Sequence, residues 1–137
     1  MEYIDTSVLI AFIDKNDDKH YIAEEMLKKY SNKIITKLNI IEMRSVLTRI
    51  NLKMEEIDAL IDYLVIKGEI KIIEVNMNKA IIKWNEIIEE IKLKTLDLLH
   101  IANAVILNAT KFVTFDKDFI SKKDRIESYK IEIINPL

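Results

Sequence analysis

Short, continuously apolar runs alternate along this chain with longer segments in which apolar residues recur every three or four positions. The short runs predict buried strands, and the longer segments predict amphipathic helices. We predict strands at residues 2–5, 34–36, 70–75, 111–114 and 131–134. We predict helices at residues 7–13, 38–50, 53–67, 77–91 and 96–109, and another from a cap at Asp17 or Asp18 to Tyr30. This alternation predicts an α/β fold with a parallel sheet and right-handed crossovers.

The ends and faces of several helices carry specific expectations. Gly68, the only glycine, is placed to end the helix 53–67 in a left-handed cap. Thr95 is placed to cap the helix that follows it, which is apolar nearly all round and is therefore expected to be buried. Stripes expected to face the core include Ile40, Met43, Leu47 and Ile50, and also Met77, Ala80, Ile81, Trp84, Ile87, Ile88 and Ile91.

The composition bounds the class of protein. The chain has 137 residues, of which 50% are hydrophobic and 32% charged, so we expect one domain, residues 1–137, with a substantial core. It has no cysteine, which excludes disulfides and cysteine zinc sites, and its two histidines disfavour a histidine-rich metal site. No apolar run approaches the roughly 18 residues that span a bilayer, and no basic segment precedes an apolar stretch. We therefore expect a soluble, cytoplasmic protein without a signal peptide.

Four acids, Asp5, Glu42, Asp97 and Asp116, stand where a predicted strand ends or a predicted helix begins. In a parallel α/β protein these junctions lie at one edge of the sheet, where such folds bind ligands. Four carboxylates at one place would repel one another strongly in a medium of low dielectric constant. Mg²⁺ and Mn²⁺ prefer oxygen ligands, so a hard divalent cation is the expected way to relieve this repulsion.

Each of these acids also has a simpler structural interpretation. Asp5 can cap the helix that follows it, and Asp97 can interact favourably with the dipole of its own helix. Glu42 can be a solvated residue or pair with an arginine of its own helix, and Asp116 opens a turn in which acids are common. The functional interpretation therefore depends on all four acids sharing one edge of the sheet.

The two histidines are not expected to act in catalysis. Cysteine is absent and His20 lacks an evident partner motif, so no Ser–His–Asp or Cys–His set is available. We expect His20 at the surface, near the start of its helix. His100, one helical turn after Asp97, is interpreted as a packing or hydrogen-bonding residue rather than as a catalyst.

Four segments of the chain resemble, in the correct order, the four motifs of PIN-domain nucleases. They are residues 3–9 (YIDTSVL), 39–44 (NIIEMR), 95–104 (TLDLLHIANA) and 113–119 (VTFDKDF). The motifs extend from residue 3 to residue 119, so the resemblance covers nearly the whole chain. In size and compactness the chain is most similar to the VapC-type toxins of prokaryotic toxin–antitoxin pairs.

The resemblance implies a three-layer α/β/α fold with a central, mostly parallel sheet. It also implies a metal-dependent endoribonuclease, in which Asp5, Glu42, Asp97 and Asp116 surround Mg²⁺ or Mn²⁺ and hydrolyse RNA phosphodiester bonds. Asp118 is a secondary candidate, and we favour Asp116 because it lies nearer the end of its strand. Further secondary candidates, expected to orient the carboxylates, are Thr6, Ser7 and Thr114.

The resemblance further implies partners. RNA is the expected substrate, and a cognate antitoxin is expected to place a basic side chain opposite the acids. Apolar surface on the helices 38–50 and 53–67 favours a homodimer, with core burial as the competing explanation. The net charge of −2 argues against binding nucleic acid through the overall field, but it is compatible with a local basic rim and a metal.

Three alternatives stay open at this point. The chain can be a PIN-fold RNA-processing nuclease that has no antitoxin. It can also be a non-catalytic binding domain of the same fold, although such a domain has no reason to keep four clustered acids. A phosphoacceptor signalling domain is disfavoured, because Asp5 stands alone on its strand and no lysine clearly follows the last strand.

Overall fold

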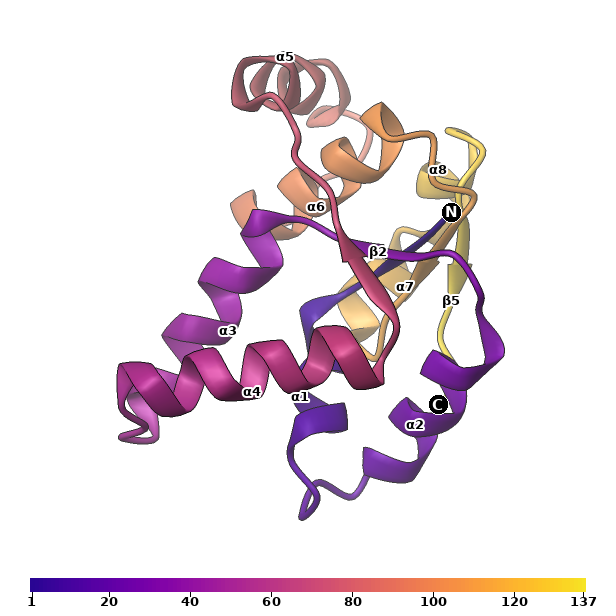
Figure 1. Ribbon diagram of the computed structural model, residues 1–137. Coiled ribbons are helices and arrows are strands. Elements are labelled where there is room, and N and C mark those ends of the chain that lie inside the picture. Colours follow the sequence, from indigo (N-terminus) through magenta and orange to yellow (C-terminus); the bar gives the residue numbers. More distant parts are fainter.

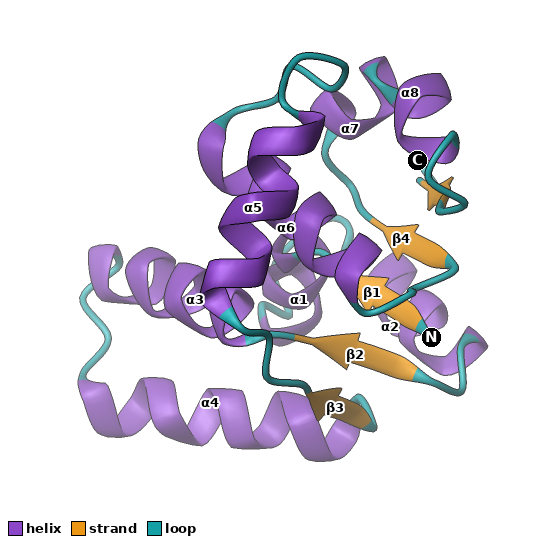
Figure 2. Cartoon of the chain, turned by 90° about the horizontal axis from the view of Figure 1, so that it is seen from above, coloured by secondary structure: helices purple, strands orange, loops and turns teal.

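A single five-stranded sheet organises the chain. In the computed structural model, which describes residues 1–137, the strands pair in the order β3-β2-β1-β4-β5 and every pair is parallel. The strands are β1 (Glu2–Ile4), β2 (Lys33–Ile35), β3 (Ile70–Ile72), β4 (Lys111–Val113) and β5 (Glu132–Ile134). The central strand is β1, with β2 on one side and β4 on the other (Figure 2). The predicted parallel sheet is confirmed.

Eight helices connect and cover these strands. They are α1 (Thr6–Ile13), α2 (His20–Lys29), α3 (Lys37–Arg49), α4 (Met54–Lys67), α5 (Met77–Ile87), α6 (Thr95–Ile106), α7 (Lys117–Ser121) and α8 (Lys123–Glu127). In Figure 1, α4 lies beside β3, while α5 packs against α6. None of the helices combines the length and the apolar character that a membrane-spanning segment requires.

Each face of the sheet has its own hydrophobic core, because successive strand residues point to opposite faces. Tyr3 and Phe112 belong to a core that they share with residues of α5, α6, α7 and α8. The next residues along these strands, Ile4 and Val113, belong to the other core, with residues of α1, α2, α3 and α4. The predicted three-layer α/β/α arrangement is therefore confirmed. The inner strands β1, β2 and β4 are buried, whereas the edge strand β3 exposes Lys71 and Ile72.

Three predicted elements end several residues earlier than the apolar pattern indicated. The third strand stops at Ile72 rather than at residue 75, α5 stops at Ile87 rather than at residue 91, and α6 stops at Ile106 rather than at residue 109. The strand ends because its partner β2 ends at Ile35, whose carbonyl accepts the last hydrogen bond, from the Ile73 N–H at 2.9 Å. Conversely, α7 and α8 form between residues 117 and 127, where no element was predicted.

The predicted caps of two helices are wrong. Thr95 is the first residue of α6 rather than its cap. Before α2, the N-cap position is taken by Lys19 and not by Asp17 or Asp18. Asp17 instead closes the preceding turn: its carboxylate accepts the Lys19 N–H at 2.8 Å and its carbonyl accepts the His20 N–H at 3.0 Å.

Several side chains differ in burial from the prediction, because an apolar stripe in the sequence does not show which part of it another element covers. Ile50, Met77 and Ile81 were expected in the core, but they are 63%, 58% and 48% exposed. Trp84 is half-buried and donates its indole N–H to a backbone carbonyl. His20 was expected at the surface but is buried, with Nδ1 3.0 Å from the carbonyl oxygen of Ala11 on α1.

Gly68 ends α4, but not in the left-handed cap that we predicted. Its φ is −78°, and the left-handed conformation belongs to the next residue, Glu69, with φ 52°. Gly68 is required for space instead: a Cβ atom there would lie 2.7 Å from the carbonyl oxygen of Leu64 and 2.9 Å from the Ile70 side chain. The glycine therefore allows α4 to approach β3 closely.

Gly68 lacks room for a Cβ atom, whereas Glu69 carries the left-handed backbone conformation, so substitutions at the two positions should have different effects. Gly68→Ala should lower the free energy of unfolding by about 1–3 kcal/mol, because the Leu64 carbonyl cannot move away without disturbing α4. Glu69→Gly should be neutral or stabilise by up to about 1 kcal/mol, because it relieves a left-handed conformation. Urea unfolding measures both variants. Equal stability of Gly68→Ala and the parent chain would contradict the close approach.

Candidate metal centre

The candidate acids lie beyond the carboxyl ends of neighbouring parallel strands. Asp5 directly follows β1, and the pairing of Ile4 with Val113 in β4 sets the residues after these two strands side by side. Asp116 follows β4 and precedes α7. Asp97 lies in the first turn of α6. In the strand order β3-β2-β1-β4-β5, successive strands are added on one side of β1 up to β3 and then on its other side from β4. The carboxyl ends of β1 and β4 therefore lie at the point where the strand order reverses, which is the usual ligand site of such folds.

Asp5 is held by side-chain hydroxyl groups rather than by the backbone N–H groups of the helix that it precedes. Its side chain makes no capping hydrogen bond, so the simpler interpretation of Asp5 as a cap is wrong. Instead Oδ2 accepts hydrogen bonds from Ser7 Oγ at 2.7 Å and from Thr114 Oγ1 at 2.8 Å. Asp5 is 5% exposed, and this burial raises the pKa of its carboxyl despite the charge of His100 and both hydroxyl donors.

Thr114 also connects Asp5 to the next acid along the sheet edge. Its Oγ1 donates to Asp5 and accepts the backbone N–H of Asp116 at 2.9 Å. Ser7 plays a parallel part, since its Oγ donates to Asp5 and accepts the backbone N–H of Phe115 at 3.1 Å. The two hydroxyls therefore tie the end of β1 to the end of β4.

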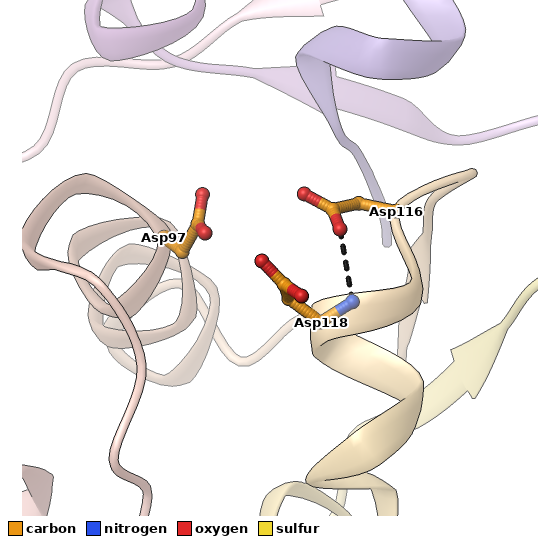
Figure 3. Close-up of side chains that lie close together, drawn as sticks. All are labelled: Asp97, Asp116 and Asp118. Atoms are coloured by element: carbon orange, nitrogen blue, oxygen red, sulfur yellow. Dashed lines mark hydrogen bonds between the residues drawn. The ribbon is translucent and has the colours of Figure 1, made fainter.

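Three carboxylates meet across the gap between α6 and α7. One oxygen each of Asp97, Asp116 and Asp118 lie within 4.8 Å of one another, and Figure 3 shows Asp97 facing the other two. Asp116 also accepts the Asp118 N–H at 2.9 Å, so its interpretation as a turn residue is correct at the same time. Both acids of the last motif therefore belong to the cluster, including Asp118, which we had ranked second.

The electrostatics of Asp97 show uncompensated negative charge. Burial raises its pKa from 3.8 to about 6, and the neighbouring charges of Asp116 and Asp5 add to this, against a smaller opposing effect of His100. No lysine or arginine forms a salt bridge with Asp5, Asp97 or Asp116. An all-oxygen donor set with excess negative charge is the kind of site that fits a hard divalent cation.

Glu42 lies apart from the three-aspartate cluster but close enough for its charge to raise the pKa of Asp97. Its Oε1 accepts hydrogen bonds from Thr6 Oγ1 at 2.7 Å and from His100 Nε2 at 2.5 Å. Burial by itself would raise the pKa of Glu42. The hydrogen bond and charge of His100, together with the hydrogen bond from Thr6, outweigh this effect and hold the pKa below its ordinary value. Glu42 is therefore ionised at neutral pH.

The alternative interpretation, in which Glu42 pairs with an arginine of α3, is wrong. Arg44 instead forms a salt bridge with Asp58 of α4 at 2.8 Å, and Arg49 Nε donates to a backbone carbonyl at 3.2 Å. The interpretation of His100 as a hydrogen-bonding residue is confirmed, since it is fully buried against Glu42.

Asn39 is the first residue of the second motif segment, but the sequence analysis assigned it no role. It is fully buried and donates through Nδ2 to the Ile4 carbonyl at 3.0 Å and to Thr6 Oγ1 at 3.1 Å. Its Oδ1 accepts the Thr36 N–H at 2.9 Å, which forms a capping box at the start of α3. The signal was the spacing of Thr36 and Asn39, because a capping box places its two members three residues apart.

Comparisons with known proteins agree with this geometry. A family model for the PIN domain matches residues 3–125. VapBC2 of Rickettsia felis, solved with a DNA fragment from its promoter, is 23% identical with a TM-score of 0.71, and the match covers 98% of each chain. VapC20 of Mycobacterium tuberculosis, a toxin that cleaves the sarcin–ricin loop, is 14% identical with a TM-score of 0.70, covering 88% of this chain and 94% of that one.

A toxin–antitoxin complex from Klebsiella pneumoniae is 18% identical with a TM-score of 0.68, and the match covers 100% of this chain and 98% of that one. At these identities the structures establish a shared fold. A comparison with curated protein sequences finds no match. The family match begins within β1, ends within α8 and includes all the acids described above, and the chain therefore belongs to the PIN domain family.

Proposed function

We propose that residues 1–137 form one PIN domain that acts as a metal-dependent endoribonuclease and hydrolyses RNA phosphodiester bonds. The observation that carries this proposal is the cluster of Asp97, Asp116 and Asp118, with oxygens within 4.8 Å, beside the buried carboxyl of Asp5. Such crowding of like charges lowers the stability of the fold unless a cation is bound. A non-catalytic domain would gain nothing from it.

The metal ion is proposed to be Mg²⁺ or Mn²⁺, held by Asp97, Asp116, Asp118 and Asp5, because these side chains offer only hard oxygen donors. A bound divalent cation would neutralise the phosphoryl oxygens and the charge that develops in the transition state. Ser7 and Thr114 orient the Asp5 carboxylate through Oδ2. Glu42 is ionised at neutral pH, and we assign it as the acceptor for a proton of the attacking water.

We further propose that this nuclease is the toxin of a toxin–antitoxin pair. Support comes from the similar structures described as a sarcin–ricin-loop-cleaving toxin and as a toxin–antitoxin complex. An antitoxin that covers the acids would need a basic side chain, whose charge-assisted hydrogen bonds would replace the cation. We also propose that this activity is cytoplasmic, because the proposed substrate is cellular RNA.

A homodimer is proposed from the apolar side chains that the chain leaves exposed. Ile41 on α3 and Met77 on α5 are 62% and 58% exposed, and they flank a cavity of about 230 Å³ that Leu38, Val75 and Leu99 also line. A two-fold interface must be complementary to itself, so it needs protruding groups beside a hollow. This surface has both.

Replacing one acid tests the proposed nuclease. Asp97→Asn and Asp5→Asn should each lower Mn²⁺-dependent cleavage of total RNA by more than about 100-fold, because an amide cannot replace an anionic ligand. Without metal at pH 8, Asp97→Asn should gain about 1 kcal/mol in free energy of unfolding, after allowing for solvent screening of this half-exposed group.

Asp62→Asn is the matched control, because Asp62 is an exposed acid on α4 with no hydrogen-bond partner among the side chains. It should leave both cleavage and stability unchanged. Cleavage retained by both Asp5→Asn and Asp97→Asn would refute the proposal. Absence of cleavage by the parent chain, together with no rise of its melting temperature on adding Mn²⁺, would favour the non-catalytic alternative.

The raised pKa of Asp97 predicts a pH dependence of metal binding. Below pH 6 the Asp97 carboxyl holds a proton that the cation must displace, so Mn²⁺ affinity should fall about tenfold per pH unit there and level off above pH 7. The folded-state pKa exceeds the ordinary 3.8, so the metal-free protein should lose stability as pH rises from 3.8 to about 6. Calorimetric titration from pH 5 to 8 measures the first effect, and a flat profile would contradict it.

The proposed dimer is tested by Ile41→Asp. A buried charge in the interface is costly, so this variant should be monomeric by light scattering at concentrations where the parent chain is dimeric. Ile66→Asp is the control, because Ile66 is 73% exposed on α4, away from the cavity. A dimer that survives Ile41→Asp but not Ile66→Asp would move the interface to the α4 surface.

A further inference from the structure

Among the acids of the proposed site, only Glu42 is hydrogen-bonded to a histidine side chain. Both hydrogen bonds to this carboxylate, from Thr6 and from His100, end on the same oxygen, Oε1. No protein donor bonds the second oxygen, Oε2. A glutamate side chain is flexible, and ordering it would cost conformational entropy if nothing held it in place.

The hydrogen atoms along this contact follow from the chemistry of the groups. An ionised carboxylate only accepts hydrogen bonds, so His100 Nε2 must carry a hydrogen and donate it to Glu42. Nδ1 of the same ring lies 2.7 Å from the Tyr3 hydroxyl. A charged ring donates from Nδ1 to the Tyr3 oxygen, and a neutral ring with its hydrogen on Nε2 accepts from the Tyr3 hydroxyl, so Tyr3 bonds Nδ1 in either state. The Tyr3 oxygen also lies 3.1 Å from Thr36 Oγ1.

The tyrosine and the histidine are both fixed by packing. Each is fully buried. The Tyr3 ring stacks on Phe112 with centroids 5.3 Å apart and meets the His100 ring edge-on at 5.6 Å. The imidazole is therefore bonded at both nitrogens, and it cannot rotate without leaving a buried polar group unpaired.

We propose that Tyr3 and His100 are positioning residues of this nuclease: Tyr3 orients the imidazole, and the imidazole holds Oε1 of Glu42 so that Oε2 alone receives the attacking water. The contact joins β1, α6 and α3, three elements far apart in the sequence, and so sets the position of Glu42 relative to Asp97 on α6. This inference rests on the proposed nuclease function. Hydrogen bonds that orient a catalytic carboxylate act by preorganisation.

The competing explanation is that the same contacts only satisfy polar groups in the core. The two explanations differ in which nitrogen of the imidazole matters. Glutamine places an amide N–H near the position of Nε2, while asparagine places its amide near the position of Nδ1. His100→Gln can therefore still donate to Glu42, whereas His100→Asn can contact Tyr3 but cannot reach Glu42.

The first experiment compares steady-state RNA cleavage and thermal unfolding of His100→Gln, His100→Asn and Tyr3→Phe. His100→Asn should lower kcat by about 10–100-fold with little change in KM, and His100→Gln should retain most of kcat. Tyr3→Phe keeps the ring stack and should lower kcat by a smaller factor. Tyr30→Phe is the control, because Tyr30 is a buried tyrosine that belongs to the core on the opposite face.

Two results would overturn the inference. The first is unchanged kcat in His100→Asn. The second is an equal loss of kcat in His100→Gln and His100→Asn that follows the loss of melting temperature, which is the result expected from a structural role alone. In both cases cleavage by the parent chain would leave the proposed nuclease function standing.

A second experiment tests the contact without any cleavage. Nitrogen-15 NMR of the full chain should show a hydrogen on Nε2 of His100 that exchanges slowly with water, and Tyr3→Phe should make this exchange faster. The His100→Asn spectrum identifies the signal. A ring with no hydrogen on Nε2 would overturn the inference, whether or not the protein cleaves RNA.

Discussion

The parallel pairing of β1 with β4 is the constraint on which the rest of the site depends. It places Asp5 against Thr114, which lies 109 residues away in the sequence, so that one threonine hydroxyl serves both strands. From this junction α1 leaves on one side and α7 on the other, and α6 brings Asp97 to the same place (Figures 1 and 3). A parallel sheet gathers the carboxyl ends of its strands at one edge, and that edge therefore collects the acids.

Gathering carboxylates in this way opposes folding, and the protein treats its acids differently. Asp5 receives two hydroxyl donors, yet burial still raises its pKa. Glu42 receives a hydroxyl and an imidazole, which lower its pKa. Asp97 receives no comparable partner, and its pKa rises to about 6. The site therefore holds an ionised glutamate beside aspartates whose mutual repulsion is not relieved. Carboxyl groups with such different pKa values are suited to different roles.

Beneath the acids lies a buried polar region rather than a purely apolar core. Asn39, Thr36 and Tyr3 link the start of α3 to the central strand, and Asn103 of α6 donates to Thr36 at 3.4 Å. Only one buried side-chain atom of the protein, Asn103 Oδ1, has no hydrogen-bond partner. A buried network that is nearly complete favours one arrangement of its members, which suits a region that must hold carboxylates in place.

The amino-acid sequence by itself determined the order of the five strands and of the helices α1 to α6, the burial of the inner strands, and the positions of Asp5, Asp97 and Asp116 at element ends, with Glu42 in the first turns of α3. These features follow from local periodicity and from the rule that parallel strands share an edge. The tertiary structure alone decided that Asp118 joins the cluster, that His100 bonds Glu42, and that Met77 and Ile81 stay exposed. Periodicity identifies an apolar face but not what covers it, and hydrogen bonds between residues 58 or 109 positions apart depend on the register of packed elements.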